Sequence, residues 1–202
     1  MRRDGSCGID LVTAARRARI GAYMQPADQA RCLVAGLLLR KVCDVTDDSQ
    51  LHFGEQGKPY LKNSGMYFNI SHSGDYVVLA TANNEIGVDI EKVTDQKTFS
   101  NAVAERCFTV EERRWMQGQK NIHEAFLTLW TAKESVMKGT GLGLSLPPET
   151  FCVLPTDSSP HHIGGRIWFF DWLDYNGHII CTATHDKAEK LEYVTVSPNE
   201  FV

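Results

Sequence analysis

Four charged side chains in two short segments have the types and the spacing needed to hold a metal-bound phosphate. Asp89 and Glu91 alternate within an apolar run, so a strand would turn both carboxylates to one face. Glu134 and Lys138 would lie on one side of a helix. Magnesium takes oxygen ligands and keeps phosphate oxygens beside carboxylates, and a lysine can neutralise charge on a departing phosphate. The pattern therefore predicts a magnesium-bound pyrophosphate.

Plainer interpretations of the same residues stay open at this point. A polar strand face would also explain Asp89 and Glu91, and a surface ion pair worth about 0.3 to 0.5 kcal/mol would explain Glu134 and Lys138. Two carboxylates on a short apolar strand need a cation or a raised pKa, however, and the helix around Glu134 is strongly apolar. Both facts favour the metal site.

Two further segments could contact a phosphate. Ser71-His72-Ser73-Gly74 ends a predicted strand and would expose hydroxyl, imidazole and backbone N–H groups together. Lys58 is a cation on a predicted turn, with a plain surface lysine as the alternative. The glycine run from Gly139 to Gly143 closes a helix instead of opening one, so it is not interpreted as a nucleotide-binding loop.

Hydrophobic periodicity and turn residues predict the elements that carry these side chains. Residues 76–82 and 86–90 are expected to form two antiparallel strands with a tight connection at Asn83-Asn84. The helix around Glu134 is expected to end at Gly139 as its C′ residue. The predicted helices cover residues 26–42, 99–118 and 122–138, and the other predicted strands cover 66–70, 151–154, 165–172, 178–183 and 191–196.

Composition limits the class of protein. The chain has 202 residues, 43% of them hydrophobic, which is typical of a soluble globular protein. A net charge of −4 excludes a general nucleic-acid-binding surface, and no apolar run is long enough to predict a membrane span. The six cysteines show no disulfide or zinc spacing, which indicates the cytoplasm. A local excess of arginines near the start, including Arg16, Arg17 and Arg19, could receive an anionic ligand or form a solvated helix face.

A loose internal similarity suggests two related halves. Residues 177–184, GHIICTAT, are similar to residues 74–81, GDYVVLAT, about a hundred positions earlier. Two unrelated half-buried strands could give the same likeness by chance. A boundary near residues 92 to 98 would fit the repeat.

Five ordered motifs together resemble a known enzyme family. The chain looks like a 4′-phosphopantetheinyl transferase of the surfactin-synthetase-activating type, over roughly residues 26 to 151. The combination of G-[VI]-D-x-E with W-x-x-K-E-S-x-x-K is highly specific. The motifs are Gly57-Lys58-Pro59, residues 68–74, residues 87–92, residues 106–112 and residues 130–146.

The resemblance implies a fold and a ligand site. It implies an α+β monomer of two similar halves, each a small antiparallel sheet packed with helices, related by a pseudo-twofold axis. The halves would cover residues 1–95 and 96–202, with coenzyme A bound in the cleft between them. The N-terminal half would contribute the nucleotide contacts and the Asp89 strand, and the C-terminal half would contribute Glu112 and the helix that carries Glu134 and Lys138.

The resemblance also implies residue roles. Asp89, Glu91 and Glu134 would hold the magnesium, and Lys138 would contact the α-phosphate and assist departure of the leaving group. Glu112 matches the position proposed in the family as a base, with Glu111 as a neighbour that could be confused with it. The coenzyme A contacts, concentrated at the 3′-phosphate end of the nucleotide, would be Arg31, Lys58, Ser71, His72, Asp89 and Lys138.

The implied reaction is transfer of 4′-phosphopantetheine from coenzyme A to a serine of an apo carrier protein, with release of adenosine 3′,5′-bisphosphate. Fatty-acid, polyketide and nonribosomal-peptide carriers, the last two typical of secondary metabolism, all suit this reaction. Trp115 and Met116, flanked by Arg113 and Arg114, could dock the carrier, and core packing is an equal alternative. A coenzyme A- or carrier-binding module without transfer activity, or a metal-dependent phosphoesterase, remains the alternative function.

Overall fold

The computed structural model describes residues 8–93, 101–155, 160–185 and 191–201. These residues form an α+β fold with small antiparallel sheets, as the sequence predicts. The helices are α1 (Ala14–Ala22), α2 (Pro26–Cys43), α3 (Asn101–Cys107), α4 (Val110–Gln117) and α5 (Ile122–Thr140). The strands are β1 (Leu51–Phe53), β2 (Pro59–Leu61), β3 (Tyr67–Ser73), β4 (Tyr76–Ala82), β5 (Ile86–Lys92), β6 (His161–Ile163), β7 (Arg166–Tyr175) and β8 (His178–Thr184).

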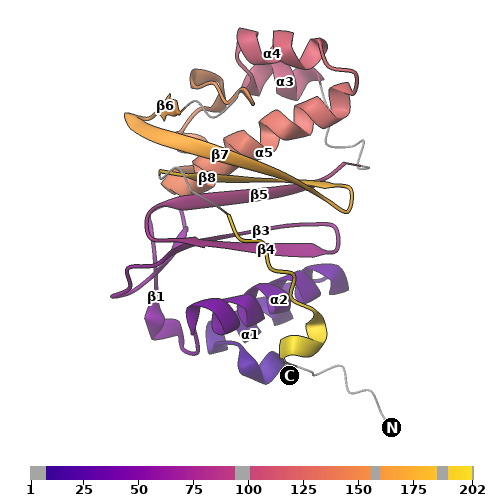
Figure 1. The fold of residues 1–202 in the computed structure, drawn as a ribbon. Coiled ribbons are helices and arrows are strands. Elements are labelled where there is room, and N and C mark those ends of the chain that lie inside the picture. The colour runs from indigo at the N-terminus through magenta and orange to yellow at the C-terminus, as the bar shows by residue number, and fades with distance from the viewer. Residues whose placement is uncertain (1–7, 94–100, 156–159, 186–190, 202) are drawn as a thin grey trace.

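The elements are arranged in layers (Figure 1). Helices α1 and α2 lie at one end, the β3–β4 hairpin covers them, and a four-stranded sheet of order β5-β8-β7-β6 follows. Helix α5 covers the outer side of that sheet, and α3 and α4 lie beyond α5. Within the described parts of the chain, no helix is long and apolar enough to span a membrane.

The β3–β4 hairpin has two faces with different partners. Because side chains alternate along a strand, Phe68 and Ile70 of β3 share one face with Leu79 of β4, and this face packs near Leu39 of α2 and Val45. The opposite face carries Asn69, Ser71 and Ser73 on β3, opposite Ala80, Val78 and Tyr76 on β4. This second face meets the four-stranded sheet, where the β4 side chains pack with Val88, Ile90 and Ile180.

Hydrogen bonds from side chains replace a backbone ladder between β3 and β5. Asn69 Oδ1 accepts from the Val88 amide at 3.0 Å, and Ser73 Oγ accepts from the Lys92 amide at 3.2 Å. Burying unpaired amides at the edge of β5 would be costly, so these polar side chains satisfy the strand edge. The N-terminal hairpin is therefore joined to the four-stranded sheet by polar contacts as well as by apolar packing.

Helix α5 packs on β5 at unusually close range. A Cβ atom added at Gly87 would lie 1.8 Å from the carbonyl oxygen of Ser135, and one added at Gly139 would lie 2.8 Å from the Trp168 ring. Ser135 Oγ also donates to the Cys181 carbonyl at 2.7 Å. Because positions 87 and 139 are glycines, α5 and β5 can pack closely against each other. The close packing brings side chains of α5 near side chains of β5.

The predicted hairpin of residues 76–82 and 86–90 is wrong. Both strands form, as β4 and β5, but β4 pairs with β3 and β5 pairs with β8. The tight turn lies instead at Gly74, whose φ of +54° suits a glycine. The similar segments 74–81 and 177–184 each begin at such a turn and continue as β4 and β8.

The predicted helix over residues 99–118 is also wrong as one element. It is broken after Cys107, because Thr109 caps α4 and forms a capping box with Glu112. Phe99 lies outside the described residues. Helix α5 continues to Thr140, and Gly141, with φ +71°, takes the left-handed cap position that was predicted for Gly139.

Two predicted strands do not form, and several short elements were not predicted. Residues 151–154 and 191–196 are irregular, and their polar groups bond to side chains, as in the contact of Thr195 with Tyr175. Apolar alternation alone cannot distinguish such segments from strands. The elements without a prediction are α1, β1, β2 and β6. The helix over 26–42 and the strands over 165–172 and 178–183 are confirmed as α2, β7 and β8.

The close contact of α5 with β5 leads us to expect that a side chain at position 87 destabilises the protein. Gly87→Ala should lower the free energy of unfolding by about 3 kcal/mol or more, because the added methyl meets backbone that cannot move aside. Gly21→Ala, in α1 with open space around it, is the control and should be neutral or slightly stabilising. Urea unfolding of both variants measures the difference. Equal stabilities would contradict the proposed close contact.

Candidate active site

Three elements bring a carboxylate, an ammonium and a hydroxyl together. Asp89 of β5 is 3% exposed, and its Oδ1 accepts from Lys138 Nζ of α5 at 2.5 Å and from Ser71 Oγ of β3 at 2.8 Å. Lys138 Nζ also donates to Ser71 Oγ at 2.9 Å. The structure thus brings together three of the predicted site residues, one from the N-terminal hairpin, one from β5 and one from α5.

Two more carboxylates adjoin this cluster. Ser73 Oγ donates to Glu91 Oε2 at 3.2 Å, on the strand face that Glu91 shares with Asp89. Burial raises the pKa of Glu91 to about 7, and the neighbouring charge of Asp89 adds to the rise. Burial and then the charge of Asp89 also raise the pKa of Glu134. Desolvation raises the pKa of Asp89 itself, against the opposing effect of Lys138.

The residues present fit a hard cation, although they do not form a closed metal cage. In the ranges that the structure describes, no group of three His, Cys, Asp or Glu side chains is gathered closely enough to hold a metal ion. Asp89 Oδ2 is nevertheless buried without a hydrogen-bond partner. An unpartnered buried carboxylate oxygen is costly, and Glu91 and Glu134 beside it offer only oxygen ligands. A partly formed oxygen site is suited to magnesium that also binds phosphate oxygens.

Two of the predicted nucleotide contacts lie beside the β3–β4 turn. Arg31 of α2 donates to the Gly74 carbonyl at 2.9 Å and pairs with Asp28 at 2.5 Å. His72 lies on the opposite face of β3 from Ser71, and its pKa is lowered by burial and then by the charge of Arg31. Arg31 therefore places a positive charge beside the cluster, and the lowered pKa of His72 favours its neutral imidazole there.

Other predicted basic contacts are held by the protein itself. Lys58 of the β1–β2 hairpin is 8% exposed, and its Nζ donates to the Gly139 carbonyl at 2.5 Å and to the Ile86 carbonyl at 3.4 Å. Burial lowers the pKa of Lys58 to about 8. On α1, Arg17 donates to the Val12 carbonyl and Arg16 contacts the Cys32 thiol. In these positions the three side chains bond to the protein itself and so contribute to its stability.

Glu112, predicted as a base, is fully buried at the start of α4. Its Oε2 accepts from the Thr109 amide at 2.7 Å and pairs with Lys133 Nζ at 2.8 Å, while its Oε1 accepts from the Val153 amide at 2.7 Å. Within the described residues, none of its hydrogen bonds or ion pairs involves Asp89, Glu91 or Glu134. Sequence reasoning gave Lys133 no role, although a lysine amid the apolar face of α5 was a signal of a buried charge that needs a partner.

Comparison with known proteins identifies the family. A family model described as the 4′-phosphopantetheinyl transferase superfamily matches residues 85–185, and one for the N-terminal part of 4′-phosphopantetheinyl transferases matches residues 2–84. The 4′-phosphopantetheinyl transferase Sfp of Bacillus subtilis strain 168 is 32% identical, over 77% of this chain and 76% of that protein. The chain belongs to the 4′-phosphopantetheinyl transferase superfamily.

Two other relatives with the name 4′-phosphopantetheinyl transferase are also similar to this chain. The 4′-phosphopantetheinyl transferase gsp of Aneurinibacillus migulanus is 34% identical over 65% of this chain, and a 4′-phosphopantetheinyl transferase of Bacillus subtilis is 35% identical over 70%. The chain spans 56% and 66% of the lengths of these two relatives. A solved holo-[acyl-carrier-protein] synthase of Thermotoga maritima is similar at 17% identity, with a TM-score of 0.34 over 49% of this chain and 61% of that one, a likeness too low to add to the assignment.

The residues predicted to dock a partner of this transferase-family chain are mostly packed inside. Met116 is 3% exposed, and Trp115 packs against the main core cluster. Arg113 donates to the carbonyls of Glu105 and Phe108, which leaves Arg114 as the exposed member of the group. Core packing, the alternative interpretation, is therefore confirmed for Met116.

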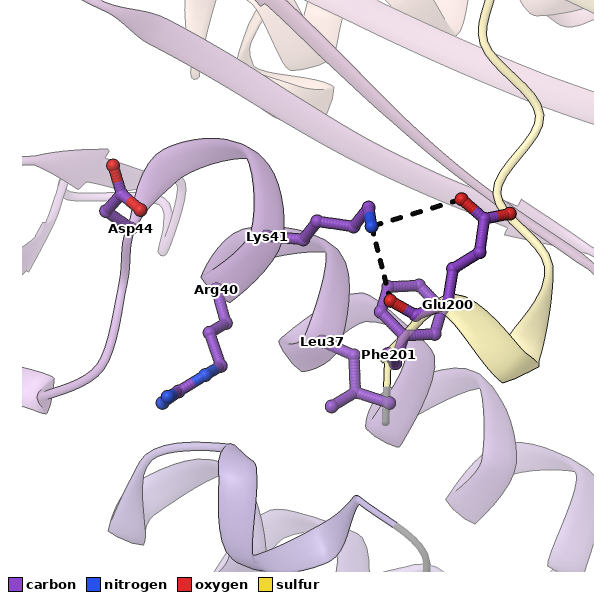
Figure 2. Close-up of a pocket in the computed structure, with 6 residues that line it drawn as sticks. All are labelled: Leu37, Arg40, Lys41, Asp44, Glu200 and Phe201. Carbon is purple, nitrogen blue, oxygen red and sulfur yellow. Dashed lines mark hydrogen bonds and ion pairs between the residues drawn. The ribbon is translucent and has the colours of Figure 1, made fainter.

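A pocket of about 260 Å³ lies elsewhere on the superfamily member, between α2 and the C-terminal residues (Figure 2). Lys41 points toward Glu200 and donates to its backbone carbonyl at 3.2 Å, and Arg40 points to the other side. The lining includes none of the predicted site residues. The pocket therefore does not bear on the site at Asp89.

Because the pKa of Glu91 is raised, we expect the stability of the protein to depend on pH. Because the pKa in the folded state, about 7, lies above the ordinary value of 4.5, the folded state binds the proton more tightly than the unfolded state. The stabilisation is complete below about pH 4.5 and is lost as the pH rises through about 7. Between about pH 4.5 and pH 7, the free energy of unfolding of the metal-free protein should fall by about 1 to 2 kcal/mol relative to that of Glu91→Gln. This magnitude allows for the partial solvent exposure of Glu91.

Urea unfolding in the presence of a chelator, at several pH values, measures this difference. Magnesium should restore stability to the parent protein at neutral pH and do so less for Glu91→Gln, because the ion binds the ionised carboxylate. A pH-independent difference between the two proteins would contradict the burial and charge repulsion described for Glu91.

Proposed function

We propose that this chain transfers the 4′-phosphopantetheine group of coenzyme A to a serine of an apo carrier protein, in a magnesium-dependent reaction. The observation that carries the proposal is the contact of buried Asp89 with Lys138 and Ser71, in a chain that belongs to the 4′-phosphopantetheinyl transferase superfamily. This contact joins the N-terminal hairpin to α5, as a ligand site between two halves requires. The proposed halves are residues 1–95 and 96–202, related by a pseudo-twofold axis.

Asp89, Glu91 and Glu134 are the proposed magnesium ligands. Their raised pKa values and the unpartnered Asp89 Oδ2 support this role, since a bound cation would stabilise all three carboxylates in the ionised form. Magnesium, when bound, would neutralise charge on the pyrophosphate of coenzyme A. Lys138 would exchange part of its contact with Asp89 for an α-phosphate oxygen and so favour departure of the leaving group.

The nucleotide of coenzyme A is proposed to bind at the edge formed by Arg31 and His72, next to Ser71. Arg31 keeps a donor to the Gly74 carbonyl, so the turn and the arginine would present a fixed cationic surface to the 3′-phosphate. Lys58 was predicted as a further contact. Its ammonium donates hydrogen bonds to carbonyls of α5 and β5, so Lys58 would support the site indirectly, by stabilising the C-terminal end of α5.

The transfer itself forms a bond between the carrier serine Oγ and the β-phosphorus of coenzyme A. The bond from that phosphorus to the bridging oxygen breaks, and adenosine 3′,5′-bisphosphate leaves with the electron pair. Positioning and electrostatic stabilisation do most of the work in such reactions, so the residues described above account for the main requirements. The serine hydroxyl would give up its proton as this bond forms, either to a carboxylate, for which the sequence predicts Glu112, or to water at the site.

The carrier could belong to fatty-acid, polyketide or nonribosomal-peptide synthesis, the last two being pathways of secondary metabolism. Arg114, the exposed member of the predicted docking group, could meet an acidic carrier surface. We also propose a monomer that acts in the cytoplasm. The five cysteines within the described residues are free thiols, which supports a reducing compartment.

One assay separates this function from the two alternatives. The protein is incubated with coenzyme A, magnesium and a panel of apo carriers, and the products are followed by mass spectrometry. A mass gain on a carrier serine supports transfer. Free bisphosphate without a modified carrier would indicate a phosphoesterase, and binding without either product would indicate a binding module.

Glu134→Gln should reduce transfer by about 100-fold or more while the protein stays folded, because it removes one charged ligand and leaves the size of the side chain unchanged. Carrier mass gain under initial-rate conditions measures the loss, and thermal unfolding checks the fold. Asp174→Asn, on an exposed position of β7, is the matched control and should transfer normally. Unchanged carrier loading by Glu134→Gln would remove it from the metal site.

A further inference from the structure

A second buried ion pair connects α5, the helix that carries Glu134 and Lys138, to α4. Lys133 and Glu112 have side chains that are 0% exposed, and their charged atoms are 2.8 Å apart. Lys133 immediately precedes Glu134, the proposed magnesium ligand. The pair joins α5 to the start of α4, so it ties the helix that carries half of the proposed site to its neighbour.

All three donors of Lys133 and both carboxylate oxygens of Glu112 have partners within the protein. The three donors of the Lys133 ammonium reach Glu112 Oε2, the Pro148 carbonyl at 2.7 Å and the Phe151 carbonyl at 2.6 Å. The ring of Phe151 lies 4.5 Å from the ammonium. Glu112 in turn bonds the Thr109 and Val153 amides through different oxygens. A carboxylate held in this way has no oxygen facing a substrate.

The pair acts on α5 from a different side than the sheet does. Successive residues of an α-helix are turned by about 100°, so Lys133 and Glu134 leave the helix in different directions. The sheet holds α5 through Gly87, Gly139 and the bond from Ser135 to the Cys181 carbonyl. Lys133 holds it through α4 and the segment of residues 148–153. The two attachments together set the rotation of α5 about its axis.

That rotation determines where the Glu134 carboxylate lies. With side chains, a helix has a radius of about 5 to 6 Å, so a turn of about 20° moves a side-chain end by about 2 Å. A carboxylate displaced this far cannot share a cation with Asp89, because metal–oxygen distances in magnesium sites vary by only a few tenths of an ångström.

We infer that Glu112 serves the proposed site by positioning α5 through Lys133, and that it does not accept the proton of the carrier serine. The inference rests on the proposed function, since it concerns the magnesium ligand Glu134. It assigns Lys133 and Glu112 as positioning residues for the transfer reaction. It also predicts that a chain without a carboxylate at position 112 can still catalyse transfer, provided that the buried lysine is removed with it.

The test compares Glu112→Gln with the double variant Glu112→Gln/Lys133→Met. Glu112→Gln leaves the Lys133 ammonium buried without its counter-charge, which should disturb α5. The double variant removes both charges, and its glutamine oxygen can still accept from a backbone amide. Isothermal titration with magnesium alone measures the ion's dissociation constant, carrier mass gain measures kcat and KM, and thermal unfolding measures the fold. All titrations are run at a temperature at which each variant is folded.

For Glu112→Gln, the magnesium dissociation constant should rise about tenfold or more, as when a group that orients a metal ligand is lost. The double variant should return to within about threefold of the parent protein and recover transfer. Glu105→Gln, at an exposed position of α3, is the matched control and should leave every value unchanged.

The magnesium affinity of Glu112→Gln decides the inference even if the double variant does not fold. An affinity equal to that of the parent overturns the inference, whatever happens to kcat. A folded double variant that binds magnesium normally but has lost transfer would identify Glu112 as a chemical participant and overturn it as well. If the parent binds magnesium but loads no carrier, the proposed transfer fails, while the comparison of affinities still tests the position of α5. If the parent binds no magnesium, the proposed site and the inference both fail.

Discussion

The buried carboxylate of Asp89 is the constraint on which the arrangement of this molecule depends. A carboxylate that is only 3% exposed must be compensated by other groups, and here Lys138 of α5 and Ser71 of β3 compensate it. Both partners come from elements far from β5 in the sequence. The fold must therefore hold α5 on one side of β5 and the β3–β4 hairpin beside it, or the carboxylate would be left without partners.

The packing around β5 meets this requirement by two different means. Toward α5, glycine at positions 87 and 139 removes the side chains that would keep the helix away from the strand. Toward β3, the polar side chains of Asn69 and Ser73 bond the amides of β5, so a sheet-like edge is formed without a backbone ladder. Strand β5 is thus held by close packing with α5 and by polar hydrogen bonds from β3. The site lies between these two contacts.

Helix α5 carries two ion pairs of different character. The pair of Lys138 with Asp89 is incomplete, because Lys138 is partly exposed and one carboxylate oxygen has no partner. The pair of Lys133 with Glu112 is complete and closed to solvent. An incomplete pair can exchange partners with a phosphate or a cation, whereas a closed pair can only hold its surroundings in place. This difference is why we assign binding to the first pair and positioning to the second.

The sequence by itself determined the local elements and the residue types of the site. Side-chain alternation placed Asp89 and Glu91 on one strand face, and helical spacing placed Glu134 beside Lys138. These features depend on neighbours a few residues away, so local patterns predict them. Motif order also predicted the family. The break between α3 and α4 was missed although it is local, because the capping box at Thr109 was not recognised.

Only the tertiary structure decided which strands pair, where Ser71 and His72 point, and which charges are buried. Strand β5 leaves its sequence neighbour β4 and pairs with β8, since an apolar strand can satisfy its hydrogen bonds with any partner of matching pattern. Lys58, Glu112 and Lys133 are buried, and their charged groups bond to carbonyls, to amides or to each other, which the sequence did not predict. Compensation of a buried charge requires contacts across long sequence separations, and no local pattern contains that information.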